Sequence, residues 1–494
     1  MCDSLSLDKL HEECGIFGIY APDADVALNT YWGLYALQHR GQESAGICVA
    51  NGYAMDIRRG MGLVNEVFRD SLPEMPGHIA IGHVRYSTTG SSLASNVQPL
   101  LVSYAGGRIS MAHNGNLTNA PALRKKLELG GSVFQTTMDS EVIVNLIARS
   151  KKKKIEERVI ESLAQVGGAY CLVIMTEDKL IGVRDPNGFR PLCLGQLPEG
   201  GWVIASESCA LDAVNAKLVR DIAPGEMVVI DGKEPHFRQI VAEPQPPALC
   251  VFEYIYFARP DSLIDGQSVY QARLAMGRQL AIESGLAADI VISVPDSGTT
   301  AAHGFSAQSG IPFAEGLMKN RYIGRTFIQP EQKKRDAGVR IKLNAVRSAV
   351  AGKSIIMVDD SIVRGTTSGR IVKMLREAGA KKIHMCVSSP PIIYPCYYGI
   401  DTSVRKELVA SSKTIDQIRR YIGADSLHYL SLEGLRQCVA NVHLDGLCYA
   451  CFNGDYPTAI PCQGETPGSK FVFEENSCGS LQKGQEKPRG RKRS

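Results

Sequence analysis

The 494-residue sequence lacks any apolar run approaching the ~18 residues that a membrane-spanning helix needs. Its first thirteen residues carry four acidic side chains and no apolar stretch, so they do not read as a secretory signal. No internal repeat at a solenoid period is visible, and neither a Walker phosphate loop nor a dinucleotide-binding glycine fingerprint occurs. We therefore expect a cytoplasmic, globular protein with no membrane association.

Neither sign of charge predominates, because the formal net charge is only +4. The tail 480–494 holds six basic residues against one acidic residue, a local +5, so the remaining 479 residues sum to about −1. A short basic tail on a neutral body is typical of a solvated, disordered end. Residues 466–494 are therefore predicted to be disordered, and no nucleic-acid partner is expected.

The length and the cysteine content set the organisation of the chain. Single hydrophobic cores stop growing at roughly 250–300 residues, so 494 residues predict two large domains. The Pro-rich stretch 242–249 is a plausible crossing between them, and the strand-then-helix units after it predict a parallel α/β sheet. Fourteen scattered cysteines do not form a disulfide framework, so a cluster among them indicates metal binding or catalysis.

A phosphate-binding loop is predicted directly after the apolar strand IIMV at 355–358. The hydroxyls of Thr366–Thr367–Ser368 lie at the start of the next helix, where backbone N–H groups and the helix dipole favour an anion. Asp359 and Asp360, just ahead of them, would repel a phosphate, so they suit ribose hydroxyls or Mg²⁺. A polar loop that merely caps a helix is the plain alternative.

The strand IIMVDD followed by SIVRGTTS resembles the signature loop of the type I phosphoribosyltransferases, which bind phosphoribosyl pyrophosphate. The resemblance implies that Asp359 and Asp360 contact ribose and Mg²⁺, with Ser297 of the pyrophosphate-side loop VPDSG also assigned to the metal. It implies substrate contacts from Arg364, Gly365, Thr366, Thr367 and Ser368, the last four at the 5′-phosphate. Residues 319–348 are similar to the mobile loop that closes over the substrate, although an exposed linker would look alike.

Cys14 is a candidate nucleophile near the start of the chain. Cysteine attacks as the thiolate, and an N-terminal cysteine brings its own base, because a free α-amino group has a pKa of roughly 7.7–8. Cys14 gains such an amine only if a propeptide, residues 1–13, is removed. Taken alone, Cys14 is more simply read as a small apolar residue entering a strand.

Five motifs occur in order over the first 140 residues: ECGIFGIY, LQHRGQESAG, GHVRYSTTG, HNGNL and TTMDSE. This set resembles the N-terminal nucleophile glutamine amidotransferases and, with the phosphate loop, the amidophosphoribosyltransferase family from residue 14 to about 460. The resemblance implies an αββα glutaminase sandwich at 14–240, followed by a phosphoribosyltransferase domain with a parallel sheet at 250–465.

The same resemblance assigns roles to individual residues of the glutaminase half. Cys14 is the nucleophile, Arg85 pairs with the α-carboxylate of glutamine, and Asp139 takes its α-ammonium. Asn114 and the backbone N–H of Gly115 form the oxyanion hole. Each has a plain alternative when taken alone: a surface salt-bridge arginine, an Asn-Gly turn and a helix-capping aspartate.

Cys448 and Cys451 form a C-x-x-C pair in what reads as a loop, YACFNGDYP. Alone, the pair fits a zinc knuckle, a redox dithiol or two unrelated thiols. The match is closest to the family class with a cleaved propeptide and an iron–sulfur cluster. That likeness implies that Cys250 and Cys396 join the pair to hold a [4Fe–4S] cluster, with zinc as the alternative.

The resemblance as a whole implies that ammonia is released from glutamine and transferred to C1 of phosphoribosyl pyrophosphate. The products are 5-phosphoribosylamine, glutamate and pyrophosphate, in the first step of purine synthesis. It also implies an internal ammonia channel, inhibition by purine nucleotides and a homotetramer. A different glutaminase-fused synthase or a phosphoribosyl-pyrophosphate-binding regulator is the alternative; IIMVDDSIVRGTTS argues against the first and the glutaminase residues against the second.

Overall fold

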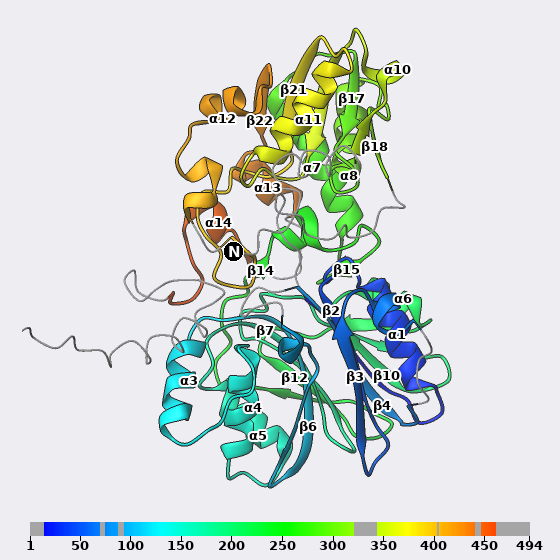
Figure 1. Cartoon of the computed structure of the whole chain (residues 1–494), viewed down its shortest axis with the longest axis vertical. Coiled ribbons are helices and arrows are strands. Elements are labelled where there is room, and N and C mark those ends of the chain that lie inside the picture. The colour runs from blue at the N-terminus through cyan, green and yellow to red at the C-terminus, as the bar shows by residue number, and fades with distance from the viewer. Residues whose placement is uncertain are drawn as a thin grey trace, which may run out of the picture.

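A computed structural model describes residues 14–69, 75–86, 93–320, 343–402, 405–439 and 446–460, which form two lobes joined end to end (Figure 1). The predicted propeptide, the basic tail and most of the predicted mobile loop lie outside these residues. No helix in the described part of the chain is long and apolar enough to cross a membrane.

The first lobe contains two antiparallel sheets that pack face to face. The seven-stranded sheet has the order β11 (Lys217–Asp221), β9 (Cys193–Gln196), β10 (Trp202–Ala205), β1 (Gly15–Tyr20), β4 (Ile79–Arg85), β2 (Ser44–Ala50), β3 (Met55–Met61). The six-stranded sheet has the order β13 (His236–Gln239), β12 (Glu226–Ile230), β8 (Leu180–Arg184), β7 (Gly168–Met175), β6 (Gly107–Leu117), β5 (Leu100–Tyr104).

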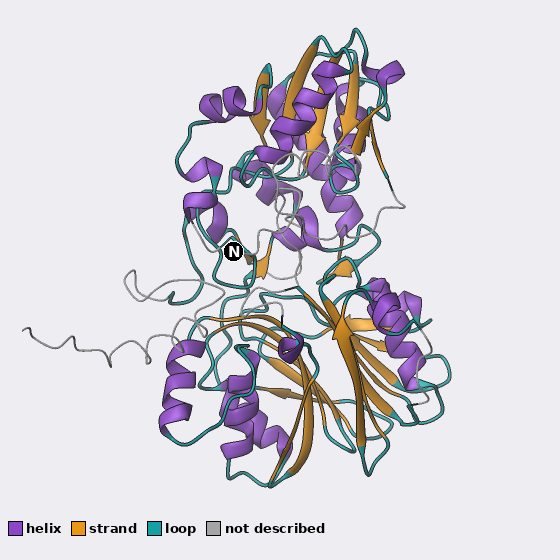
Figure 2. Cartoon of the chain, viewed as in Figure 1, coloured by secondary structure: helices purple, strands orange, loops and turns teal. Residues whose placement is uncertain are grey.

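Apolar side chains from the inner faces of both sheets form the layer between them, including Ile16 and Ile81 from one sheet and Val173 from the other. Helices cover the two outer faces (Figure 2). On the seven-stranded sheet they are α1 (Val26–Ala36), α2 (Val64–Val67) and α6 (Ser208–Ala213); on the six-stranded sheet they are α3 (Ala120–Leu129), α4 (Ser140–Arg149) and α5 (Ile155–Leu163). The predicted αββα sandwich is confirmed.

The second lobe is built on a four-stranded parallel sheet, as predicted. Its order is β17 (Ile290–Ser293), β20 (Ser354–Asp359), β21 (Lys382–Val387), β22 (Ser426–Tyr429). The helices around it are α7 (Val269–Ser284), α8 (Thr299–Ser309), α10 (Arg347–Val350), α11 (Thr366–Glu377), α12 (Ile415–Ile422) and α13 (Leu432–Cys438). The lobe also contains two antiparallel strand pairs, β15 (Leu263–Ile264) with β16 (Gln267–Ser268) and β18 (Leu317–Lys319) with β19 (Leu343–Ala345).

One local expectation needs correction, because the C-x-x-C pair does not lie in a simple loop. Cys448 ends strand β23 (Leu447–Cys448), which pairs in parallel with β14 (Leu249–Cys250), and Cys451 lies in the short helix α14 (Ala450–Asn453).

Buried ionic contacts cross the junction between the lobes. The three largest fully buried side chains in the described residues are arginines of the first lobe: Arg40, Arg184 and Arg190. Each reaches residues beyond 245: Arg40 pairs with Glu253 at 2.7 Å, Arg184 with Asp265 at 2.8 Å, and Arg190 donates to the carbonyl oxygen of Tyr398 at 2.6 Å.

Candidate active site

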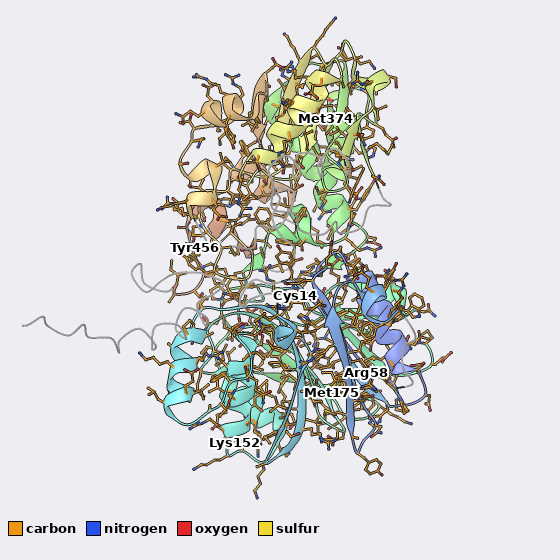
Figure 3. All side chains as sticks on the ribbon, in the orientation of Figure 1. Cys14, Arg58, Lys152, Met175, Met374 and Tyr456 are labelled. Carbon is orange, nitrogen blue, oxygen red and sulfur yellow. The ribbon has the colours of Figure 1, made fainter. Side chains whose placement is uncertain are left out.

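One pocket brings together four of the five predicted glutaminase residues. Its wall includes Cys14, Arg85, Gly115 and Asp139. They come from four places in the sandwich: the residue before β1, the end of β4, the C-terminal part of β6 and the residue before α4. Because Gly15 of β1 pairs with Val84 of β4, the residues next to them along the chain, Cys14 and Arg85, meet at one sheet end. Figure 3 shows Cys14 at the end of the first lobe that faces the second.

Cys14 is held by contacts on both its side chain and its backbone. It is 8% exposed, and its Sγ lies 3.4 Å from the carbonyl oxygen of Tyr86. Its own carbonyl oxygen accepts a hydrogen bond from Nε of Arg40 at 3.2 Å. The thiol is therefore fixed in the pocket wall instead of being packed away within a strand.

The plain alternatives for Arg85 and Asp139 do not hold. Arg85 is buried, and its Nη1 lies 3.9 Å from the Glu43 carboxylate, so it is not a surface salt-bridge residue. Asp139 occupies the cap position of α4, but its side chain makes no capping bond. Its Oδ2 instead accepts the N–H of Leu117 at 2.9 Å, which orients the carboxylate toward β6.

Asn114 and Gly115 lie within strand β6 and not in a turn. Asn114 is 1% exposed and is not in the pocket wall itself, but its Nδ2 is buried with no hydrogen-bond partner among the described residues. Gly115 has a φ of +143°, and a Cβ there would lie 2.1 Å from the carbonyl oxygen of Ala169. The backbone at residue 115 therefore requires glycine.

Sequence reasoning gave no role to several residues of this pocket. The Oε1 atom of Gln98 accepts the backbone N–H of His113 at 2.8 Å, and Nδ1 of His113 lies 2.8 Å from Oγ of Ser140. Burial lowers the pKa of His113 below its ordinary value, so the ring is neutral near pH 7. His113 and Ser140 belong to the quoted motifs HNGNL and TTMDSE, whereas no sequence signal marks Gln98.

The predicted acidic pair lies at the carboxyl end of β20, where ligands of parallel sheets bind. Asp359 is 2% exposed, and Asp360 is fully buried. The two oxygens of Asp360 accept hydrogen bonds from Ser297 at 2.5 Å and from Ser361 at 2.7 Å. The structure therefore brings Ser297 beside the acidic pair, as the sequence predicts.

The predicted phosphate loop leads into helix α11. Gly365 is the residue before the helix and has a φ of +81°, a conformation that favours glycine. Thr366 is exposed, whereas Thr367 and Ser368 are buried at the first turn, where N–H groups have no acceptor within the helix. Arg364 pairs with Glu407, an acid that sequence reasoning missed.

Four cysteines surround a second pocket at the junction of the lobes. Cys250, Cys396, Cys448 and Cys451 all line it. Cys250 and Cys448 are directly paired across β14 and β23. Burial raises the pKa of Cys448 to about 12, and burial together with the other three thiols raises the pKa of Cys451.

In the described part of the chain, no group of three or more His, Cys, Asp or Glu side chains is placed to hold a metal ion. Thiols spread around a cavity differ from thiols that converge on one point. In a four-iron cluster the four thiolates belong to four irons, so they surround the cluster.

The sandwich with its cysteine pocket and the parallel sheet with its phosphate loop define a glutamine amidotransferase joined to a phosphoribosyltransferase. The family profile described as glutamine amidotransferase domain matches residues 83–213. The amidophosphoribosyltransferase of Bacillus subtilis is 50% identical over 91% of this chain and 95% of its own length. Amidophosphoribosyltransferase 2, chloroplastic, of Arabidopsis thaliana is 50% identical over 94% of this chain and 83% of its own.

A solved structure is similar to this chain as well. The glutamine phosphoribosylpyrophosphate amidotransferase of Bacillus subtilis, complexed with ADP and GMP, matches with a TM-score of 0.86 and 49% identity, covering 91% of this chain and 98% of that chain. The chain belongs to the amidophosphoribosyltransferase family. It is a glutamine-dependent enzyme that transfers ammonia to phosphoribosyl pyrophosphate in the first committed step of purine biosynthesis.

Proposed function

We propose that Cys14 is the nucleophile of the glutaminase reaction, and the observation that carries this is its position in one pocket with Arg85, Gly115 and Asp139. The thiolate attacks the side-chain amide carbon of glutamine, and ammonia leaves with a proton from the α-amino group of Cys14. Water then hydrolyses the γ-glutamyl thioester to glutamate. In the second lobe, ammonia attacks C1 of phosphoribosyl pyrophosphate and displaces pyrophosphate, which gives 5-phosphoribosylamine.

The pocket supplies side chains of opposite charge for the α-carboxylate and the α-ammonium group of glutamine. The guanidinium of Arg85 suits the α-carboxylate of glutamine, because its planar fork can donate two parallel hydrogen bonds. Asp139 suits the α-ammonium. The hydrogen bond from Leu117 N–H to Asp139 fixes this carboxylate before substrate arrives, which reduces the entropic cost of binding.

The oxyanion of the tetrahedral intermediate is assigned to Asn114 and Gly115. The buried Nδ2 group of Asn114 lacks a hydrogen-bond partner, and an unsatisfied buried donor is costly unless a ligand completes it. The backbone N–H of Gly115 is the second donor. Losing one such donor costs about 2.7–4 kcal/mol of transition-state stabilisation in acyl transfer.

The phosphoribosyl site is assigned to the carboxyl end of β20 and the start of α11. Asp359 and Asp360 would bind ribose hydroxyls, and together with Ser297 they would hold Mg²⁺, because hard oxygen ligands suit this ion. Gly365, Thr366, Thr367 and Ser368 would hold the 5′-phosphate at the helix N-terminus, with Arg364 next to them. Bound Mg²⁺ would supply positive charge to the pyrophosphate that leaves.

The four thiols at the lobe junction fit a [4Fe–4S] cluster. All four line one pocket, and metal binding there would displace their thiol protons. The reaction contains no redox step. The cluster would therefore tie β14, at the crossing between the lobes, to β23 and α14 near the end of the described chain.

Further properties belong to the same proposal. We assign residues 1–13 to a propeptide, 14–240 to the glutaminase domain and 250–465 to the phosphoribosyltransferase domain, with 466–494 as a tail. Purine nucleotides are proposed as inhibitors, because the Bacillus subtilis enzyme was solved with ADP and GMP. A homotetramer and a cytoplasmic location complete the proposal; sedimentation and cell fractionation test them.

A paired experiment tests the central assignment. The mass of the purified chain shows whether it begins at Cys14, and glutamate and pyrophosphate release are measured with glutamine or with ammonia. Cys14→Ser should abolish glutamine use and leave ammonia-dependent synthesis. Asp139→Asn, which does not touch the thiol, should raise KM for glutamine and also keep ammonia-dependent synthesis. If Cys14→Ser retains glutamine hydrolysis, the nucleophile is wrongly assigned.

A further inference from the structure

A short segment of the second lobe, residues 396–399, lies between the two pockets, and we name it the strap. Cys396 and Tyr398 of the strap line the cysteine pocket. The carbonyl oxygen of Tyr397 accepts a hydrogen bond from Nδ2 of Asn116 at 2.9 Å. Asn116 directly follows Gly115 on β6, so the strap contacts the strand that carries the proposed oxyanion donors.

A backbone-to-backbone contact accompanies this hydrogen bond. Gly399 has a φ of +118°, and a Cβ built there would lie 3.4 Å from the carbonyl carbon of Gly115 and 3.6 Å from its Cα. A Cβ on Gly115 itself would meet the carbonyl oxygen of Ala169 at 2.1 Å. The backbone of Gly115 therefore lies close to both Ala169 of the neighbouring strand and Gly399 of the strap.

The strap is itself held firmly in place. Nη2 of the fully buried Arg190 donates to the carbonyl oxygen of Tyr398 at 2.6 Å, and the ring of Tyr398 stacks on Phe189 with centroids 4.1 Å apart. On its other side, the backbone N–H of Tyr398 contacts Sγ of Cys396 at 3.3 Å. The hydroxyl of Tyr398 also lies 3.0 Å from Oγ1 of Thr458 in the second lobe, so residues of both lobes hold the strap.

We infer that the strap is a positioning element for the oxyanion hole, with Asn116 and Gly399 as positioning residues. Neither residue touches glutamine. They act by fixing the Gly115 peptide, so the glutaminase pocket is complete only when the second lobe is docked. This inference rests on the proposed role of Gly115 in the glutaminase reaction.

The test compares two asparagines near the end of β6 in the full-length enzyme. Asn116→Leu keeps the side-chain size but removes the donor to Tyr397. Asn119→Leu removes two side-chain hydrogen bonds of the same length, 2.9 Å, one to the carbonyl oxygen of Gln165 and one from the N–H of Gly167, and does not touch the strap. Gly399→Ala is a second strap variant, because its methyl group would press on Gly115 and on Arg190.

The strap variants should lower kcat for glutamine hydrolysis by about 10–100-fold, because small displacements of a catalytic group have effects of this size. KM for glutamine should stay within about threefold, since Arg85 and Asp139 are untouched, and ammonia-dependent synthesis within about twofold. Hydrogen exchange of peptides covering residues 107–117 should be faster in Asn116→Leu than in Asn119→Leu.

The inference is overturned if kcat is unchanged in both strap variants. It is also overturned if glutamine- and ammonia-dependent activities fall in equal proportion, as general destabilisation would produce. Cys14→Ala in the parent enzyme separates failure of the strap inference from failure of the proposed function on which it rests. If that variant still hydrolyses glutamine, the proposed function itself fails, whatever the strap variants show.

Discussion

Arg40 offers the sharpest test of how the lobe junction supports the glutaminase pocket. Its side chain is fully buried and pairs with Glu207 at 2.6 Å and with Glu253 at 2.7 Å. Its Nε also donates to the carbonyl oxygen of Cys14. The change Arg40→Met keeps an extended apolar stem and removes every one of these contacts.

The expected loss of stability in Arg40→Met follows from the two buried carboxylates that would be left without their partner. Removing one partner of a buried ion pair typically costs about 3–5 kcal/mol, because the other charge stays buried without compensation. Burial alone would raise the pKa of Glu207, but His39 and Arg40 together hold it well below its ordinary value. This stabilisation is present above the unfolded-state pKa and is lost as the pH falls through the folded value. The variant should therefore differ most from the parent at neutral pH.

Urea unfolding and initial rates with glutamine or ammonia give the readout, with Arg184→Met as the matched control. Arg184 is equally buried, but its hydrogen bonds go to Asp265, Ile222 and Gly188 and not to Cys14. Both variants should unfold at clearly lower urea concentrations, and only Arg40→Met should lose glutamine hydrolysis selectively. The double variant Arg40→Met/Glu253→Gln should be less destabilised than the sum of its single changes.

Two results would refute this reasoning. One is an Arg40→Met protein whose stability lies within about 0.5 kcal/mol of the parent, the range of ordinary surface substitutions. The other is an equal loss of glutamine hydrolysis in Arg40→Met and Arg184→Met, which would mean that loosening the junction at any point disturbs the pocket.

Three further predictions concern the pocket, the core and the cysteine site. Gly115→Ala, which places a methyl group against Ala169, should lower kcat for glutamine hydrolysis by about 100–1000-fold and leave ammonia-dependent synthesis; equal losses contradict the assignment. Burial lowers the pKa of His83 from 6.5 to about 3, so between these pH values the unfolded chain binds a proton that the folded chain does not. The free energy of unfolding therefore decreases as the pH is lowered through this range, by up to ~1.4 kcal/mol per pH unit. His83→Gln should remove this acid sensitivity in urea titrations, and exposed His236→Gln should not. Air should bleach a brown protein and lower its melting temperature, whereas colourless, active protein with one zinc per chain would exclude the cluster.

The sequence predicted the parts of the fold that depend on local pattern. The apolar run at 355–358 and the amphipathic residues after Thr366 gave strand β20 and helix α11, with Asp359 and Asp360 between them. Helix α3 was missed, because Lys125, Lys126 and a proline at its start hide its apolar face. Local pattern therefore identified elements with a strong apolar period and missed a weaker one.

The site residues divide in the same way, into those that local motifs mark and those that only the packing of the fold brings together. Ordered motifs predicted Cys14, Arg85 and Asp139 as site residues, and the structure brings these three into one pocket. They could not reveal Gln98, whose role depends on facing His113 across the fold, or Glu407, whose partner Arg364 is 43 residues earlier. Pairings of this kind are set by the packing of the lobes and leave no periodic trace in the sequence.

The buried arginines explain why the junction is ionic and not simply apolar. A buried ion pair adds little net stability over well-packed apolar side chains, but leaving one charge unpaired is costly. Arg40, Arg184 and Arg190 are fixed to the first lobe and find their partners at three separate points of the second. An apolar interface would tolerate sliding, whereas only one orientation satisfies three directional contacts together. In the proposed mechanism ammonia passes from Cys14 to the loop after β20, and a single lobe orientation would keep the two sites in a constant relation from one turnover to the next.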